Sequence, residues 1–147
     1  MGKNISEVTM HRFDVCFQIV SEEVSPDRVT KLLNISPDEY FEPGATTGMS
    51  DGKSVERDAG GPGIWSIKDP SVETSTLEQI ELLLTVIRPL SNELCELKRA
   101  GAQMRFFVGF FSNDTLGWML LPCKLMEEIG SLGIDVDVSF YGSCGNS

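Results

Sequence analysis

The fold is decided by the stretch IDVDVSFY, residues 134–141, in which apolar and polar residues alternate without a break. A period of two residues is typical of a β-strand with one buried face, because successive side chains of a strand point to opposite sides. The predicted buried residues are Ile134, Val136, Val138 and Phe140. The opposite face carries Asp135 and Asp137, and it must either stay in water or meet a partner.

Other stretches predict further strands of the same sheet. Residues 13–20 alternate as well, with Phe13, Val15, Phe17 and Ile19 facing inward. Residues 104–111 are apolar on both faces except at Arg105, which is typical of a strand inside a sheet. Short apolar runs at 64–67 and 117–121 predict two short strands.

Three segments carry helix signals. Ser25 caps the first segment, Pro26 fits its first turn, and Asn34 can end it. The second and longest helix begins at Ser75 or Thr76 and has an apolar stripe from residue 77 to residue 97. Pro89 removes one backbone donor, so we expect a kink or break near 87–89. A third helix follows Pro122, with Leu125, Met126 and Ile129 inward.

This order of elements predicts an α+β fold, with an antiparallel or mixed sheet and helices packed mainly on one face. Strand, proline and helix follow one another near both Pro26 and Pro122, which favours two pseudo-symmetric halves. We expect a flexible segment at 1–12, a single domain at 13–142 and a tail at 143–147. Residues 44–63 are rich in Gly, Ser, Thr and Asp and predict a long loop inside the domain.

The charge of the chain is strongly negative and unevenly placed. Its 147 residues carry a net charge of −10, with seven acids against two bases in 14–42 and five against one in 114–141. Such a field repels nucleic acid and anionic membranes and attracts basic partners. No apolar run approaches the roughly 20 residues of a membrane span, and the first residues lack the apolar core of a secretory signal. We therefore expect a cytoplasmic protein.

No catalytic or cofactor motif emerges from the sequence. His11 is the only histidine and the four cysteines form no C-x-x-C pair, so neither zinc nor iron–sulfur binding is indicated. Residues 48–54 have only three residues between their glycines, one fewer than a phosphate-binding loop needs, and no helix pattern follows. Asp135 and Asp137, with Asp14 as a third group, could serve acid–base chemistry or a divalent cation. A solvated sheet face with Arg105 as counter-charge is the favoured interpretation, and we expect neither an enzyme nor a cofactor.

Several features together resemble a bacterial family of small domains of unknown function, numbered four-two-seven-nine. The features are the opening strand with Phe17-Gln18-Ile19, the helix that runs into residues 32–37, the stretch 44–65, the helix 77–97 and the closing strand 132–141. The resemblance covers about residues 13–141 and rests mainly on residues that mark where strands and helices begin and end. Members of the family resemble immunity proteins that accompany bacterial toxin systems. The resemblance implies no catalytic residues.

These observations lead to one functional hypothesis and one alternative. The chain is expected to be an acidic, non-enzymatic binding protein, an immunity protein that neutralises a cognate toxin by covering its active or substrate-binding surface. The expected partner-binding residues are Asp14, Glu22, Glu23, Asp38, Glu39, Asp135 and Asp137. The alternative is a small-ligand or regulatory domain in which the loop 44–63 is a lid, with Lys53, Arg57 and Trp65 as contacts. The sequence leaves the oligomeric state open.

Overall fold

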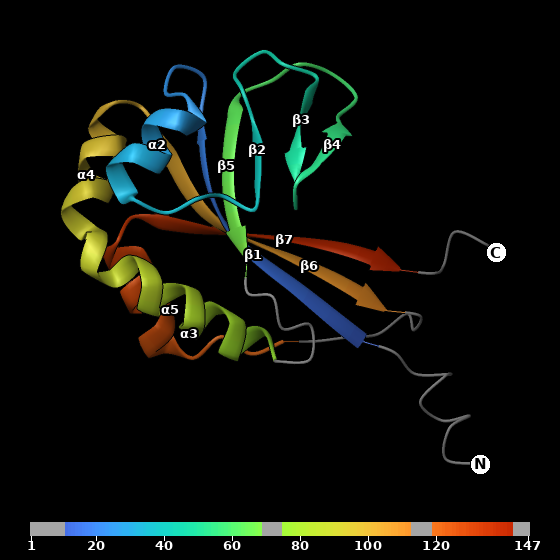
Figure 1. Ribbon diagram of the computed structural model, residues 1–147. Helices are drawn as coiled ribbons and strands as arrows, with labels where there is room; N and C mark the ends of the chain where they lie inside the picture. Colours follow the sequence, from blue (N-terminus) through green and yellow to red (C-terminus); the bar gives the residue numbers. More distant parts are fainter. Residues whose placement is uncertain (1–10, 69–74, 113–118, 143–147) are drawn as a thin grey trace.

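A computed structural model describes residues 11–68, 75–112 and 119–142 of the chain (Figure 1). Its strands are β1 (His11–Ser21), β2 (Glu39–Phe41), β3 (Thr47–Ser50), β4 (Lys53–Glu56), β5 (Gly63–Lys68), β6 (Gln103–Ser112) and β7 (Ile134–Gly142). Its helices are α2 (Pro26–Leu33), α3 (Thr76–Ile87), the short 3₁₀ helix η1 (Arg88–Leu90), α4 (Ser91–Arg99) and α5 (Cys123–Ser131). No helix within these ranges is long and apolar enough to cross a membrane.

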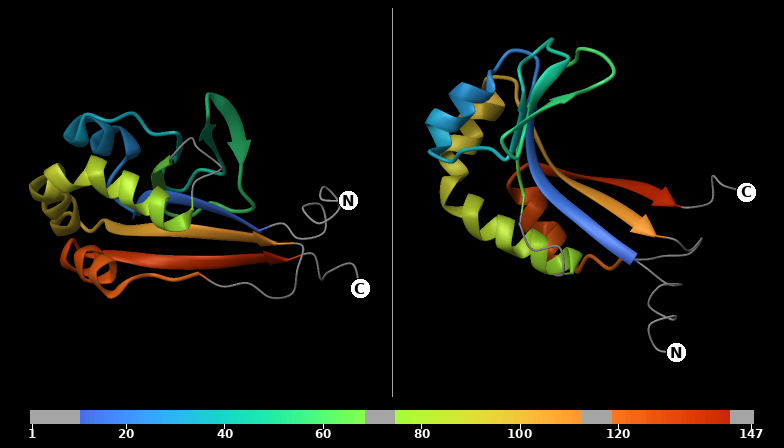
Figure 2. Two further views of the ribbon diagram at one scale, coloured as in Figure 1. Left: turned by 90° about the horizontal axis from the view of Figure 1, so that it is seen from below. Right: turned by 45° about the vertical axis from the view of Figure 1, so that its right-hand side comes forward.

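The strands form one sheet in the order β4-β3-β2-β5-β1-β6-β7. Neighbouring strands run antiparallel, except for β6 and β7, which are parallel and joined through α5. Among the described residues, the helices lie together on one side of this curved sheet, and none of them covers the other side (Figure 2). The prediction of an α+β fold with a mixed sheet is therefore confirmed.

Local signals in the sequence place the helices. The side chain of Ser25 accepts a hydrogen bond from the backbone N–H of Arg28, and Asn34 ends α2 in the left-handed region at φ 58°. Ser75 and Glu78 form a reciprocal capping box at the start of α3. Pro89 lies in η1, which separates α3 from α4, so the predicted break near 87–89 is confirmed.

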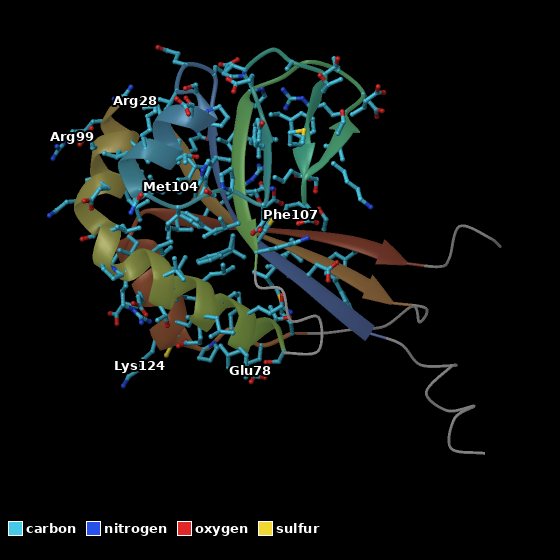
Figure 3. All side chains as sticks on the ribbon, viewed as in Figure 1. Arg28, Glu78, Arg99, Met104, Phe107 and Lys124 are labelled. Carbon is cyan, nitrogen blue, oxygen red and sulfur yellow. The ribbon has the colours of Figure 1, made fainter. Side chains whose placement is uncertain are left out.

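The core lies between the sheet and the helices. The inward side chains of β1, Val15, Phe17 and Ile19, are at most 2% exposed. The helices contribute most of the apolar stripe predicted from the sequence, including the fully buried Ile80 and Leu84, but Leu77 at its start is 36% exposed. Charged side chains such as Arg28, Arg99 and Lys124 project from the outer side of the helix layer (Figure 3).

The prediction of a long loop over 44–63 is wrong in its centre, which forms the hairpin of β3 and β4. Asp51 and Gly52 turn the chain there with φ values of 50° and 80°. An Asp-Gly pair is a strong hairpin signal, but the strands beside it are only four residues long and lack an apolar alternation. The strand β2, between the first helix and this hairpin, is only three residues long, which is too short for an alternation to be established.

Three other expectations are corrected. Phe140 is 71% exposed although its alternation predicted a buried position, because the end of β7 extends beyond the helices (Figure 2). Met126 is 50% exposed, since only Leu125 and Ile129 of α5 reach the core. Residues 119–121 form no strand.

The expected ends of the domain are only partly described. His11 and Arg12 belong to β1 and pair with β6, so the proposed flexible segment 1–12 is too long at its end. Residues 1–10, the tail 143–147 and the first part of the predicted strand 117–121 lie outside the described residues.

Candidate functional site

The side of the sheet that bears no helix is the surface from which a site can be built, and we call it the open face. Every second residue of each strand points to it. The strand register aligns one residue from each of the seven strands in a single row across this face. In strand order the row consists of Lys53, Ser50, Glu39, Ser66, Gln18, Arg105 and Asp135. Every member is polar or charged, so the row defines a continuous polar band.

Arg105 organises the part of the band formed by β1, β6 and β7. Its Nε donates a hydrogen bond of 2.8 Å to Oε1 of Gln18, and its Nη1 lies 3.5 Å from Oδ2 of Asp137. The side chains of Arg105 and Asp137 are 35% and 46% exposed. Arg105 therefore balances one carboxylate of the open face, as the sequence suggested, and Asp135 stays exposed beside it.

Cys16 lies on the open face between Lys68 of β5 and Phe107 of β6 in the register. Burial raises the pKa of its thiol above the ordinary value, and hydrogen bonds with Ser66 and Gln18 offset only part of that effect. A thiol with a raised pKa is protonated at neutral pH and is a poor nucleophile. The position of Cys16 therefore does not suit covalent catalysis.

Asp38 and Lys68 fix the end of strand β5. Oδ2 of Asp38 accepts a hydrogen bond of 2.9 Å from the backbone N–H of Lys68. Nζ of Lys68 lies 2.8 Å from Oδ2 of Asp51, and this hydrogen bond raises the pKa of Lys68. The Asp38 carboxylate thus has a structural role at the end of β5.

Apart from Asp38, the structure separates the predicted partner-binding acids into two groups. Asp14, Glu39, Asp135 and Asp137 are at open-face positions of β1, β2 and β7. Asp14 faces Gly109 of β6 and is separated from β7 by that strand, so β1 and β7 are not direct neighbours. Within the described ranges, no three acidic, cysteine or histidine side chains are grouped so that they could hold a metal ion.

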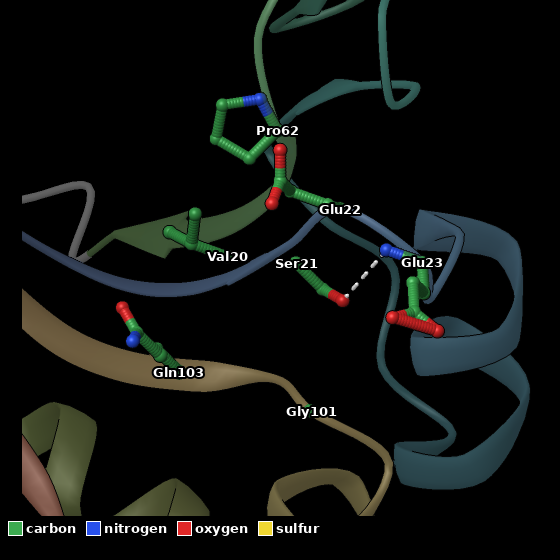
Figure 4. A pocket seen from close by; sticks show the side chains of 7 residues that line it. All are labelled: Val20, Ser21, Glu22, Glu23, Pro62, Gly101 and Gln103. Carbon is green, nitrogen blue, oxygen red and sulfur yellow. Dashed lines mark hydrogen bonds between the residues drawn. The ribbon is translucent and has the colours of Figure 1, made fainter.

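Glu22 and Glu23 lie apart from the band, in the turn after β1, where they border a pocket of about 290 Å³ (Figure 4). Oγ of Ser21 accepts hydrogen bonds from the backbone N–H groups of Glu23, at 3.1 Å, and Val24, at 2.9 Å. These bonds fix the turn, and both glutamate side chains remain exposed. The remaining lining residues are Val20, Pro62, Gly101 and Gln103.

The residues of the alternative ligand site are not brought together. Trp65 is 1% exposed, faces the helices, and donates from Nε1 to Oγ1 of Thr30 at 3.0 Å. Arg57 directs its guanidinium at backbone carbonyl groups of the segment 42–62. Lys53 is exposed on the open face at the far border of the sheet.

Sequence reasoning did not identify Gln18, Ser66, Cys16 and Phe107 as members of one surface. The alternation of residues 13–20 placed Gln18 on the outward face, but it contained no information on which residues of other strands lie opposite. Gln18 is 8% exposed and Ser66 is 4% exposed, so both would be classed as core residues from burial alone. Only the strand register shows that Ser66 and Gln18 lie in the row between Glu39 and Arg105.

Comparison with known proteins gives one match. The family model described as "Domain of unknown function (DUF4279)" matches residues 9–143. No curated protein matches this chain, and no solved structure matches it.

Proposed function

We propose that this chain, which belongs to the DUF4279 family of domains of unknown function, is a non-enzymatic domain that binds a basic protein partner through its open face. The observation that carries the proposal is the polar band across all seven strands on a side without helices. Gln18 and Ser66 in the middle of the band are buried, so a partner would contact the band through its other members, whose spacing is fixed by the strands. Such a surface suits recognition of another protein better than enclosure of a small substrate.

The charges of the open face indicate a basic partner. Asp14 and Asp135 are exposed, and Asp137 is paired with Arg105 at 3.5 Å. Together with the net charge of −10, these carboxylates would steer a cationic surface toward the strands β1, β6 and β7. Phe107 lies half-buried between Cys16 and Asp137 and supplies an apolar contact at the centre of this region.

The side chains on the open face do not favour an enzymatic mechanism. The buried thiol of Cys16 has a raised pKa, which works against a nucleophilic role at neutral pH. Arg105 is engaged by Gln18 and Asp137, so it already has an acceptor and a counter-charge within the face. This arrangement holds charges at fixed positions, which is what a recognition surface needs.

We infer further that the partner is a bacterial toxin and that the chain acts in the cytoplasm as its immunity protein. The support is chemical. Toxins that act on nucleic acids carry cationic surfaces, and an acidic sheet face would cover such a surface and exclude an anionic substrate by like-charge repulsion. In this arrangement Asp135 and Asp14 would take the positions that the phosphates of the substrate occupy when the toxin binds its substrate.

The proposal is tested by capturing the partner on variants of the open face. The triple variant Asp14→Asn, Asp135→Asn, Asp137→Asn removes three negative charges from this surface. The matched control, Glu81→Gln, Glu96→Gln, Glu127→Gln, removes three exposed charges from the helices. A basic protein captured from the native host should bind the wild type and the control. Its affinity for the triple variant, which we call the face variant, should be at least tenfold lower.

The immunity role has its own test. The captured protein is expressed alone and together with the wild type, the control or the face variant. Growth should stop when the captured protein is expressed alone and should resume with the wild type and the control, but not with the face variant. Equal capture by the face variant and the control would refute the proposed surface, and harmless expression of the captured protein would refute the toxin.

A further inference from the structure

The outer edge of β7 is a second feature with which a partner can interact. β7 is the last strand in the sheet, is nine residues long, and pairs with β6 alone among the described strands (Figure 2). Half of its backbone N–H and C=O groups therefore point away from the sheet without a strand partner in the described residues. A long edge of this type is a template for one more strand.

The side chains of β7 define what such a strand would have to carry. Asp135 and Asp137 are two residues apart on the open face, so their spacing matches alternate side chains of a neighbouring strand. On the other side, Phe140 is 71% exposed, and its ring lies edge-on to Phe110 with the centroids 5.4 Å apart. One side of an added strand would therefore meet carboxylates, and the other side would meet an aromatic ring.

We propose that an extended segment of the partner adds to β7 as an eighth strand, with Lys or Arg at alternate positions beside Asp135 and Asp137 and apolar residues between them. This inference rests on the proposed function, since it specifies how the basic partner is held. Main-chain hydrogen bonds would supply much of the affinity, and the alternating side chains would supply the selectivity. Opposite side chains of paired strands lie about 5 Å apart, within reach of an ion pair.

Charge argues against a second copy of the chain as the occupant of this edge. Two β7 strands pairing with each other would bring the carboxylates of Asp135 and Asp137 from both copies onto one stretch of the same face. Like charges placed opposite each other in a sheet are destabilising. Each copy also has a net charge of −10. A cationic strand reverses the sign of every one of these interactions.

The two aspartates would not contribute equally. Asp137 already has Arg105 at 3.5 Å, so an incoming ammonium or guanidinium group would be attracted by the carboxylate and repelled by Arg105. Asp135 is exposed on the same strand, and the ion pair of Arg105 is made with Asp137 instead. We therefore expect Asp135 to be the main determinant of the charge selectivity.

The inference can be tested with the full chain and synthetic peptides. The probe is the capped peptide acetyl-Lys-Val-Lys-Val-Lys-Val-Lys-amide, which can place all its lysines on one side of a strand. Hydrogen exchange read by mass spectrometry should show protection of residues 134–140 and none at the opposite edge, residues 53–56. Two control peptides should give no protection. One has Glu in place of Lys, and the other has the four lysines in one block.

A charge reversal tests whether the probe peptide binds at β7. Asp135→Lys should weaken binding of the probe by about tenfold, because an attraction on the edge becomes a repulsion. Glu127→Lys on α5, with the same change in net charge, should change it less than twofold. Absence of protection at millimolar probe, equal protection by the Glu peptide, or a dimer of the free chain in sedimentation would each overturn the inference.

The two proposals fail separately. If the triple variant of the open face loses its captured partner while the probe leaves residues 134–140 unprotected, the open face remains a binding surface and strand addition is wrong. If the probe protects β7 but the triple variant captures the partner as well as the control does, β7 can accept a cationic strand, but the partner is held neither by the proposed surface nor by Asp135 and Asp137.

Discussion

Arg57 gives a sharp test of whether the segment 42–63 is a structural unit or a ligand-binding lid. Its guanidinium donates to four backbone carbonyl oxygens of this segment and lies 4.7 Å above the centre of the Phe41 ring. The acceptors are Ala45 at 2.8 Å, Pro62 at 2.8 Å, Gly61 at 3.2 Å and Glu42 at 3.4 Å. All five interactions are lost in Arg57→Met, which keeps the length of the side chain.

The expected loss follows from these contacts. A hydrogen bond that involves a charged group contributes about 1.5–3 kcal/mol when well formed, and a cation over an aromatic ring about 0.5–1 kcal/mol. Only the two bonds of 2.8 Å have short geometry, and the site is half-exposed, so water replaces part of what is lost. We therefore expect Arg57→Met to lower the free energy of unfolding by about 3 kcal/mol. Arg57→Lys should lower the free energy of unfolding by about 2 kcal/mol, because one ammonium group cannot reach the carbonyl oxygens of Ala45 and Pro62 together.

Urea unfolding followed by tryptophan fluorescence measures both variants, since Trp65 is buried in the adjacent strand β5. With a slope near 2 kcal/mol per molar urea, a loss of about 3 kcal/mol shifts the midpoint by about 1.5 M. Lys53→Met is the control, because Lys53 is exposed on the same hairpin, and it should change stability by less than about 0.5 kcal/mol. A loss below 0.5 kcal/mol in Arg57→Met would refute the structural role and return Arg57 to the ligand-binding interpretation.

Three further predictions concern single side chains. The hydrogen bonds from Arg88 lower the pKa of Glu128, so their stabilisation is present above the unfolded-state pKa and is lost as the pH falls through the lower folded-state pKa. Glu128→Gln should therefore be less stable than the wild type in urea at neutral pH and equal to it in strong acid; a pH-independent difference would contradict this. Burial raises the pKa of Cys16, so iodoacetamide should modify exposed Cys95 well before Cys16 in peptide maps, and the reverse order would be inconsistent with the structure. Gly130 lies in α5 with no heavy atom within 4 Å of an added Cβ, so Gly130→Ala should raise stability by about 0.5–1 kcal/mol in thermal unfolding, and a lower melting temperature would count against it.

The sequence predicted those parts of the fold in which a local signal and a long element coincide. β1 and β7 have uninterrupted alternation, α2 has a capping serine and an ending asparagine, and Pro89 separates α3 from α4. The short strands β3 and β4 were not predicted, because four residues do not establish a period. Their stability comes from pairing with β2 and with one another, which is a non-local property.

The candidate site was predicted less completely, for a related reason. Alternation places Asp14, Asp135 and Asp137 on outward faces, but it cannot place the three on one surface without the strand order. The order puts β6 between β1 and β7, so Arg105 of β6 lies opposite Gln18 of β1 and Asp135 of β7 and also pairs with Asp137. The structural role of Asp38 also depends on a contact with Lys68, thirty residues further along the chain.

The position of Arg105 also bears on how one surface can be both stable and selective. A cluster of carboxylates without a cation would repel itself in the free protein, and the sheet would lose stability at neutral pH. Arg105 removes part of that repulsion by pairing with Asp137, and Gln18 fixes its direction through a bond of 2.8 Å. The carboxylate of Asp135 then remains exposed at the edge of the sheet, where a partner can reach both its charge and the backbone of β7. The alternation of residues 134–141 thus gives β7 two different sides. One side packs against the core, and the other carries Asp135, whose charge a partner can reach at the edge of the sheet.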